Sequence, residues 1–362
     1  MVLSRVVEPG DPDAATLVAA HGAEALVARL ADAPAGLDKA GKVAGWSARL
    51  RFTDLQRPEA DGERLDARFV CPGDPEWPDR LADLVVEPFG LWVRGAGNLA
   101  ALTADSVAVV GARAATAYGE HVAGELAVGC SVAGWTVVSG GAYGIDATAH
   151  RGALAADRET VCVLAGGVDR LYPAGHAPML RRILERGALV SEAAPGCAPS
   201  KSRFLVRNRL IAGLTRGTVV VEAALRSGSL NTARWARDLG RVVMGVPGPV
   251  TSTASAGVHE LLRSESALLV TAADEVVEHL SPIGTGLAPR REAPVRPRDR
   301  LGPRTRQVLD AVPRVRPAAT TSIARTAGLT TADVTPCLER LRTDGWVVEP
   351  SPGRWRASAT AP

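Results

Sequence analysis

Three apolar runs in this sequence each end in a short segment of glycine, serine or arginine, residue types that hold anions in proteins. The first run ends in Gly111 and Arg113, the second in Ser139-Gly140-Gly141, and the third is followed by Ser227-Gly228-Ser229. Glycine lets backbone amides approach a ligand, helix N-termini direct unpaired N–H groups at it, and the planar guanidinium of arginine binds phosphate. These segments predict a phosphate site with Arg113 as its candidate cation. The alternative for Arg113 is a pair with a carboxylate at the sheet edge.

The strongest charge feature is the segment 201–216, which carries five basic residues and no acidic one. They are Lys201, Arg203, Arg207, Arg209 and Arg216, and Phe204 lies among them. Phosphate contacts dominate the affinity of proteins for nucleic acids, and an aromatic ring among cations offers a surface for a stacked base. The segment therefore indicates a nucleic-acid site. The alternatives are a solvated basic face and a core phenylalanine, and Arg207 and Arg209 could instead bond carbonyls beneath the loops.

Further polar residues near these loops have simpler explanations. Asp146 falls in the first turn of an expected helix, where a carboxylate is favourable as a partner of the helix dipole. His150 follows one turn later, and a lone histidine on a helix is more often packed than catalytic. Glu222 ends an apolar strand, and we expect it to anchor the loop that follows. Ser227 or Ser229 can cap the next helix while the same turn admits a phosphate.

The elements that must position these residues alternate between strand and helix. Strand-like runs fall near residues 107–110, 136–138, 160–164, 188–191, 218–222, 242–245 and 267–270, with helical patterns such as 119–133 and 229–239 between them. This alternation predicts an α/β fold with right-handed crossovers and an extended Rossmann-like, mostly parallel sheet. In such a sheet the loops at the carboxyl ends of the strands surround one crevice.

Four regions separate along the chain. We expect a small helical, SAM-like module at 1–75, a Rossmann-like DNA-binding core at 76–280, a Pro- and Arg-rich linker at 281–302, and a winged-helix module at 303–362. The third helix of that last module would be its reading helix, but Glu339 lies beside Arg340 and Pro336 falls inside the helix. Contact with DNA and contact with protein stay open for this module.

Composition excludes some classes of protein and leaves others open. The 362 residues carry a net charge of only +3, which neither requires nor excludes binding of nucleic acid. The distribution of charge along the chain is therefore the better indicator. Five cysteines stand singly without a C-x-x-C pair, which predicts neither a zinc site nor disulfides and fits a reducing compartment. No run of eighteen apolar residues occurs, so we expect no membrane span, a cytoplasmic protein and no cofactor.

At this point the residues resemble a known family, DNA-processing protein A (DprA/Smf), a bacterial factor of natural transformation. The resemblance runs from about Trp77 to Val270. It is carried by these motifs in the family's order: Val107-Ala-Val-Val-Gly-Ala-Arg113, Val138-Ser-Gly-Gly-Ala-Tyr-Gly-Ile-Asp146, Val168-Asp-Arg-Leu-Tyr-Pro173, Arg207-Asn-Arg-Leu-Ile-Ala-Gly213, Ser227-Gly-Ser-Leu230 and Val246-Pro-Gly248.

The resemblance implies a basic pocket that binds single-stranded DNA, loading of the RecA recombinase onto that strand, displacement of single-strand binding protein, and homodimers formed through the Rossmann domain. By position, Arg113, Lys201 and Phe204 match the family's DNA-contacting arginine, lysine and aromatic residue, and the turns 139–141 and 227–229 match its phosphate-facing loops. Leu205 departs from the family's pattern, which has proline after the aromatic residue.

Two other functions remain as alternatives. One is an enzyme of the nucleoside monophosphate phosphoribohydrolase type, whose loop supplies a carboxylate for general acid–base work. The loop Ser227–Thr232 has no Asp or Glu, so the sequence favours a protein that is not an enzyme. The other is a regulator that senses a nucleotide and binds duplex DNA through its winged helix.

Overall fold

The computed structural model describes residues 1–32, 41–54, 56–289 and 296–361. By its internal contacts the chain divides into two compact units, Met1–Pro289 and Arg290–Pro362, each of which is described by itself.

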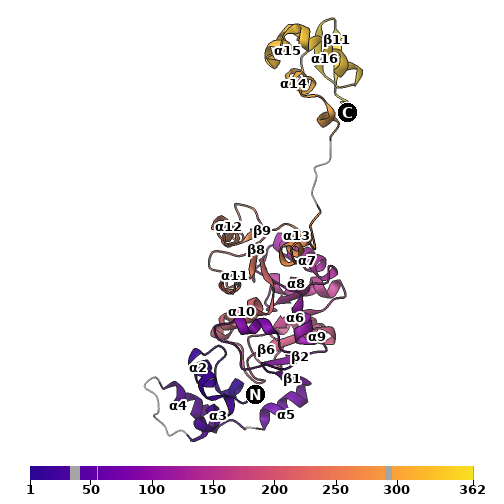
Figure 1. Cartoon of the computed structure of the whole chain (residues 1–362). Coiled ribbons are helices and arrows are strands. Elements are labelled where there is room, and N and C mark those ends of the chain that lie inside the picture. Colours follow the sequence, from indigo (N-terminus) through magenta and orange to yellow (C-terminus); the bar gives the residue numbers. More distant parts are fainter. Residues whose placement is uncertain (33–40, 55, 290–295, 362) are drawn as a thin grey trace. The chain divides into compact units, whose positions relative to one another are not determined.

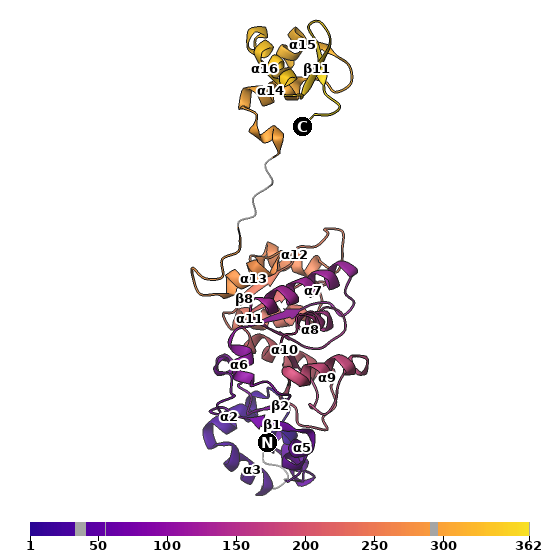
Figure 2. The same cartoon turned by 90° about the vertical axis from the view of Figure 1, so that its right-hand side faces the viewer.

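The first unit is built on a sheet flanked by helices (Figures 1 and 2). This sheet has nine strands in the order β1-β2-β6-β5-β4-β3-β7-β8-β9. The strands are β1 (Ala67–Val70), β2 (Leu91–Arg94), β3 (Ser106–Val110), β4 (Thr136–Ser139), β5 (Thr160–Val163), β6 (Ala188–Ser191), β7 (Gly217–Val220), β8 (Val242–Gly245) and β9 (Leu268–Leu269). Pairing is parallel from β6 through β5, β4, β3, β7 and β8 to β9, and antiparallel at β1–β2 and β2–β6. The predicted mostly parallel α/β sheet is confirmed.

Helices cover both faces of the sheet, which explains why the central strands are continuously apolar. Successive side chains of β3 alternate between two cores: Val107 and Val109 pack with α7 (Ala117–Val132), α8 (Ile145–Ala155) and α13 (Ala273–Leu280). Ala108 and Val110 pack on the other face with α6 (Leu99–Ala104), α10 (Lys201–Leu214), α11 (Ser229–Asp238) and α12 (Ala256–Arg263). Helix α9 (Ala177–Arg186) packs with β5 and β6.

The strand order reverses beside β3. From β3 the chain adds β4, β5 and β6 on one side, and α10 then carries it back to β7 on the other side of β3. In open α/β sheets the loops diverge at such a reversal and leave a crevice beyond the carboxyl ends of the two strands. The loops after β3 and β7 therefore flank the place where a ligand is expected.

The N-terminal part is helical, as expected. It contains α1 (Leu3–Val6), α2 (Pro12–His21), α3 (Ala23–Asp32), α4 (Lys42–Arg51) and α5 (Arg57–Leu65), and these helices lie beside the β1–β2 edge of the sheet (Figure 1). Leu26, Leu30, Trp46 and Leu50 are among the residues of their small core. Strands β1 and β2, which the sequence does not predict, join the main sheet directly.

Within residues 296–361, the second unit contains three α-helices and a small sheet. The elements are α14 (Pro303–Ala311), α15 (Thr320–Ala327), α16 (Thr331–Thr343), β10 (Ala318–Ala319), β11 (Val347–Ser351) and β12 (Arg354–Ala357), with the sheet order β10-β12-β11. A short 3-10 helix at Pro297–Arg300 precedes α14, and the first unit has two more, at Asp79–Asp83 and Ala174–His176. The three helices and the β11–β12 hairpin lie within the region 303–362, which the sequence assigns to a winged-helix module. The winged-helix assignment and the domain boundaries stay predictions.

Among the described residues, no single helix has the length and apolar composition needed to cross a membrane. The bent pair Pro12–His21 and Ala23–Asp32, with 107° between its helices, meets that test only when the two are taken together.

Candidate nucleic-acid interface

A pocket of about 510 Å³ lies where the strand order reverses. We call it the switch-point pocket. Helix α10 and the segments that follow β3, β4, β7 and β8 supply its walls. Its lining residues are Val110–Ala114, Ala142, Asp146, Phe204, Leu205, Arg207, Asn208, Ile211, Ala224, Arg226–Ser229, Thr232, Thr253 and Ala254. The fold thus brings together Arg113, Phe204 and the turn 227–229, which are far apart in the sequence.

Arg113 and Phe204 meet at this pocket. Arg113 is exposed, and its guanidinium carbon lies 4.9 Å from the centroid of the Phe204 ring. The second cation near that ring is Arg207, with 5.9 Å between its guanidinium carbon and the centroid. Among the described residues no carboxylate lies within 4 Å of Arg113. Arg113 is therefore available to an anion, and the alternative of a local carboxylate partner finds no support in the described part of the chain.

The turn 227–229 leads into the N-terminus of α11. The hydroxyl oxygens of Ser227 and Ser229 are 2.7 Å apart, so the two side chains hydrogen-bond each other. A Cβ atom added at Gly228 would meet nothing within 4 Å, which leaves the backbone there open to a ligand. Asn208 on α10 donates from Nδ2 to the Gly228 carbonyl oxygen at 3.2 Å. The open turn is thus fastened to α10. The first N–H groups of α11 have partners within the turn, since Leu230 N–H donates to the Ser227 carbonyl oxygen and Asn231 N–H to the Gly228 carbonyl oxygen. The positive end of the α11 dipole lies at this turn.

The turn 139–141 is placed differently from its expected role. The hydroxyl of Ser139 is buried and donates to the Val109 carbonyl oxygen at 2.7 Å, so it points into the sheet. Gly140 packs so closely on Arg207 that an added Cβ would lie 2.5 Å from the guanidinium, and Gly141 has a φ of +67°. Gly140 and Gly141 line a smaller cleft that borders the switch-point pocket.

Arg207 supports this turn from within. Its guanidinium is buried and donates to the Gly140 carbonyl oxygen at 2.9 Å and to the Val163 carbonyl oxygen. Burial lowers the pKa of Arg207, an effect that the nearby Asp146 carboxylate opposes. Burial raises the pKa of Asp146, although Arg207 and backbone N–H donors favour its ionised form. These contacts match the structural alternative for Arg207, which lines the pocket while most of its donors are engaged.

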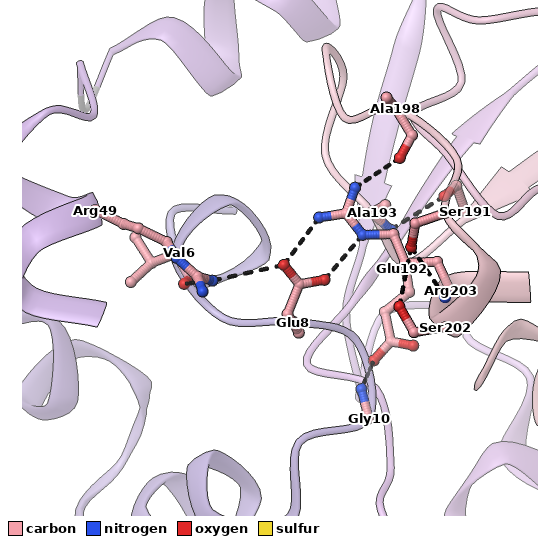
Figure 3. Close-up of polar contacts among 11 residues, drawn as sticks. Val6, Glu8, Gly10, Arg49, Ser191, Glu192, Ala193, Ala198, Ser202 and Arg203 are labelled. Carbon is pink, nitrogen blue, oxygen red and sulfur yellow. Dashed lines mark hydrogen bonds and ion pairs between the residues drawn. The ribbon is translucent and has the colours of Figure 1, made fainter. Parts of the chain in front are cut away.

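Arg203 and Arg209 face the N-terminal segment instead of the pocket. Arg203 donates from Nε and Nη2 to the two carboxylate oxygens of Glu8 at 2.8 and 3.0 Å, and Figure 3 shows Glu8 between Arg203 and Arg49. Arg209 is only 3% exposed and donates to Glu192 at 2.6 Å and to the Val86 carbonyl oxygen at 2.8 Å. Neither residue lines the switch-point pocket.

Lys201 is the first residue of α10 and is exposed. Residues three and four positions apart share a helix face, so Lys201 lies on the face that carries Phe204 and Leu205. It does not line the pocket itself. Lys201 is thus placed to contact the part of a ligand that extends out of the pocket beyond Phe204.

The Glu222 side chain is structural, but it anchors the start of α7, whereas the sequence predicts that it anchors the loop that follows Glu222. The side chain is 1% exposed and accepts hydrogen bonds from the backbone N–H and the hydroxyl of Thr116 at 2.9 and 2.6 Å. Its carboxylate therefore fixes the start of α7 and is not free for acid–base work on a ligand.

Sequence reasoning missed several residues that shape the site. Asn208 holds the turn 227–229, and Tyr143 and Tyr172 line the smaller cleft beside the pocket. Helical spacing could have indicated Asn208, which lies four positions after Phe204. The two tyrosines stand in separate loops after β4 and β5, so only the order of strands in the sheet brings them together.

The parallel sheet, its strand-order reversal and the pocket there define a Rossmann-type protein with a cationic ligand pocket. Residues 68–281 match the model of the family described as DNA recombination-mediator protein A. A DprA protein of Mycobacterium tuberculosis H37Rv is 45% identical over 370 residues, which cover 98% of this chain and 92% of that protein. The chain belongs to the DNA recombination-mediator protein A family.

Other relatives and solved structures agree with this assignment. Protein Smf of Escherichia coli K12 is 41% identical over 213 residues, which cover 58% of this chain and 56% of that protein. The crystal structure of DNA processing protein A from Streptococcus pneumoniae superposes with a TM-score of 0.65 at 30% identity, covering 77% of this chain and 96% of that one. The protein from Helicobacter pylori gives a TM-score of 0.52 at 27% identity, covering 58% of this chain and 94% of that one.

Proposed function

We propose that this chain binds single-stranded DNA at the switch-point pocket and presents the strand to a RecA-type recombinase. The observation that carries the proposal is the placement of Arg113 over the Phe204 ring, beside the open turn 227–229. A guanidinium and the positive end of the α11 dipole suit phosphates, and the exposed part of the ring suits an unstacked base. The Helicobacter pylori relative is described as having a unique single-stranded DNA binding mode, which supports the same ligand here.

The proposal assigns Arg113, Lys201, Phe204 and the turn 227–229 to direct contact with the strand. Gly140, Gly141 and Arg207 shape the wall beside them. Ser139, Arg203 and Arg209 have internal partners and take no direct part. No bond is broken in this scheme. The loop Ser227–Thr232 carries no carboxylate, and the nearby carboxylate of Glu222 is engaged with Thr116.

The family supports a wider role. Its description as a recombination mediator supports recombinase loading and displacement of single-strand binding protein. We propose a homodimer formed through the Rossmann domain, in which a second pocket raises the affinity for a long strand through effective concentration. The five cysteines are free, which agrees with a cytoplasmic location.

The test is a titration of labelled oligonucleotides, single and double stranded, at several salt concentrations. We expect preference for single strands with little sequence dependence. In Arg113→Ala and Lys201→Ala the affinity falls about tenfold, and the salt slope falls by about one, because each variant removes one phosphate contact. Arg181→Ala, which removes an exposed arginine of α9, is the matched control.

Three results would contradict the proposal. If Arg113→Ala and Lys201→Ala both left the affinity and its salt dependence unchanged, the switch-point pocket would not be the DNA-binding site. A preference for duplex DNA would favour a regulator. Steady release of free base from a nucleotide would favour an enzyme.

A further inference from the structure

The chain has only three tyrosines, and two of them lie beside the switch-point pocket. Tyr143 is 52% exposed in the turn after β4, and Tyr172 is 49% exposed in the loop after β5. With Phe204 they border a cleft whose lining is Arg113, Gly140, Gly141, Ala142, Tyr143, Tyr172, Pro173 and Phe204. We call this the ring cleft. Half-exposed aromatic rings gathered at one place suit a ligand that stacks.

Each ring is held by protein contacts on one side. The centroids of Tyr172 and Phe204 are 6.0 Å apart, with 49° between the ring planes. Tyr143 packs edge-on against His176, with centroids 4.5 Å apart, and His176 Nδ1 lies 3.1 Å from the Gly141 carbonyl oxygen. A Cβ atom at Gly175 would lie 3.0 Å from the Tyr143 hydroxyl oxygen, so glycine there makes room for the ring. The rings are therefore positioned before any ligand arrives.

The ring cleft continues the switch-point pocket. Arg113, Ala142 and Phe204 line both of them. The volume of the ring cleft is about 30 Å³, roughly that of one water molecule, so the cleft does not enclose a base. A base can instead lie on the outer faces of the rings, next to the guanidinium that binds its phosphate.

We propose that Tyr172 and Tyr143 extend the stacking surface of Phe204 and hold a second unpaired base of the bound strand. This inference rests on the proposed function, since it assigns the strand's path beyond Arg113. The strand crosses Arg113 with its phosphates, places one base on Phe204, and places the neighbouring base on Tyr172 with Tyr143 beside it. Such stacking tolerates any base, because every base has an aromatic face.

The experiment compares a uniform oligothymidylate with the same backbone carrying abasic sugars throughout. Affinities are measured by fluorescence anisotropy for the full chain and for Tyr172→Ala, Tyr143→Ala, Tyr172→Phe and Tyr143→Phe. Tyr118→Ala is the matched control, because this third tyrosine is 40% exposed and lines neither cleft. Thermal unfolding verifies that each variant is folded.

We expect Tyr172→Ala to weaken binding of the oligothymidylate about tenfold, and Tyr143→Ala less, with unchanged salt slopes because no charge is removed. The phenylalanine variants and Tyr118→Ala should bind like the unaltered chain. On the abasic strand, all of these variants should bind alike.

Wild-type affinity of both alanine variants for the oligothymidylate would overturn the inference. So would an equal loss on the abasic strand, since the tyrosines would then act on the backbone. If Arg113→Ala weakens binding while the tyrosine variants do not, only this inference fails. If the unaltered chain does not bind single strands, the proposed function fails with it.

Discussion

The two sides of helix α10 carry cations from one short stretch of sequence in opposite surroundings. Toward the N-terminal segment, Arg203 and Arg209 are matched by Glu8 and Glu192. On the face shared with Phe204, Lys201 is exposed and, within the described residues, has no carboxylate within 4 Å. The difference teaches that a basic sequence does not by itself define a binding face. Carboxylates from distant segments determine which cations remain available to a ligand.

The largest expected effect is a loss of stability, without a loss of DNA binding, when Arg209 is replaced. Arg209→Met leaves the Glu192 carboxylate buried without its cation, and burial already raises the pKa of Glu192. We expect the free energy of unfolding to fall by about 3 kcal/mol, as is typical when one partner of a buried pair is removed. Urea unfolding measures it, with Arg181→Met on α9 as the control. If the folded variant also showed a weaker affinity for single strands and a smaller salt slope, Arg209 would contact DNA, and the contrast between the two sides of α10 would be wrong.

The next effect is expected on the opposite face. Phe204→Ala should weaken single-strand binding about tenfold, because a stacking surface is lost, and should leave the salt slope unchanged. The unfolding free energy should change by less than about 1 kcal/mol, since the ring is partly exposed. Anisotropy and urea titrations measure both quantities. Phe52→Ala, which removes a ring that is 92% exposed in the N-terminal part, is the control. A large stability loss with unchanged affinity would make Phe204 a core residue.

A smaller effect is expected when the carboxylate partner of Arg203 is removed, because Arg203 then becomes available to a ligand, as Lys201 already is. Arg203 holds the pKa of Glu8 below its usual value through their hydrogen bonds, so Glu8 is ionised at neutral pH. Glu8→Gln removes that charge and frees Arg203 for a phosphate. We expect a two- to fivefold gain in affinity at low salt and a salt slope steeper by up to about one. Glu63→Gln is the control, as Glu63 is exposed on α5. An unchanged slope would show that Arg203 cannot reach the strand.

The smallest effect concerns pH. Burial raises the pKa of Asp146, which lines the pocket, and its ionised form repels phosphate. Affinity should therefore rise as pH falls through this raised pKa, because protonation removes the repulsion while the DNA phosphates stay ionised. In Asp146→Asn that rise should be absent, and affinity at neutral pH should be about twofold higher. Anisotropy titrations across pH test it, and the same pH profile in both proteins would assign the effect to other groups.

The sequence predicts the central strands of the parallel sheet, β3 to β7, well because they are buried on both faces and therefore continuously apolar. Strands β1 and β2 escape prediction. Arg68 interrupts the apolar pattern of β1 at the sheet edge, and the apolar run of β2 is only three residues long before Arg94 ends it. In both cases the local pattern follows burial, and burial at an edge depends on segments elsewhere in the chain.

The sequence identifies which residue types form the site, but it does not predict most of the contacts that these residues make. Arg113 and Phe204 meet because the strand-order reversal places the loop after β3 beside helix α10. Arg203 could not be assigned from sequence, since its partner Glu8 stands 195 positions earlier. Ser139 has the right type and position, but its hydroxyl turns to the Val109 carbonyl oxygen, a direction that only the packed sheet determines.

The position of Lys201 gives the chain a chemical handle. Lysine occurs only at 39, 42 and 201. Lys42 forms an ion pair with Asp13 in the N-terminal part, and Lys39 lies outside the described residues. Among the lysines, amine-selective acylation should therefore mark Lys201 readily, and mass spectrometry of the tryptic peptides could follow protection of that single amine as DNA occupies the neighbouring surface.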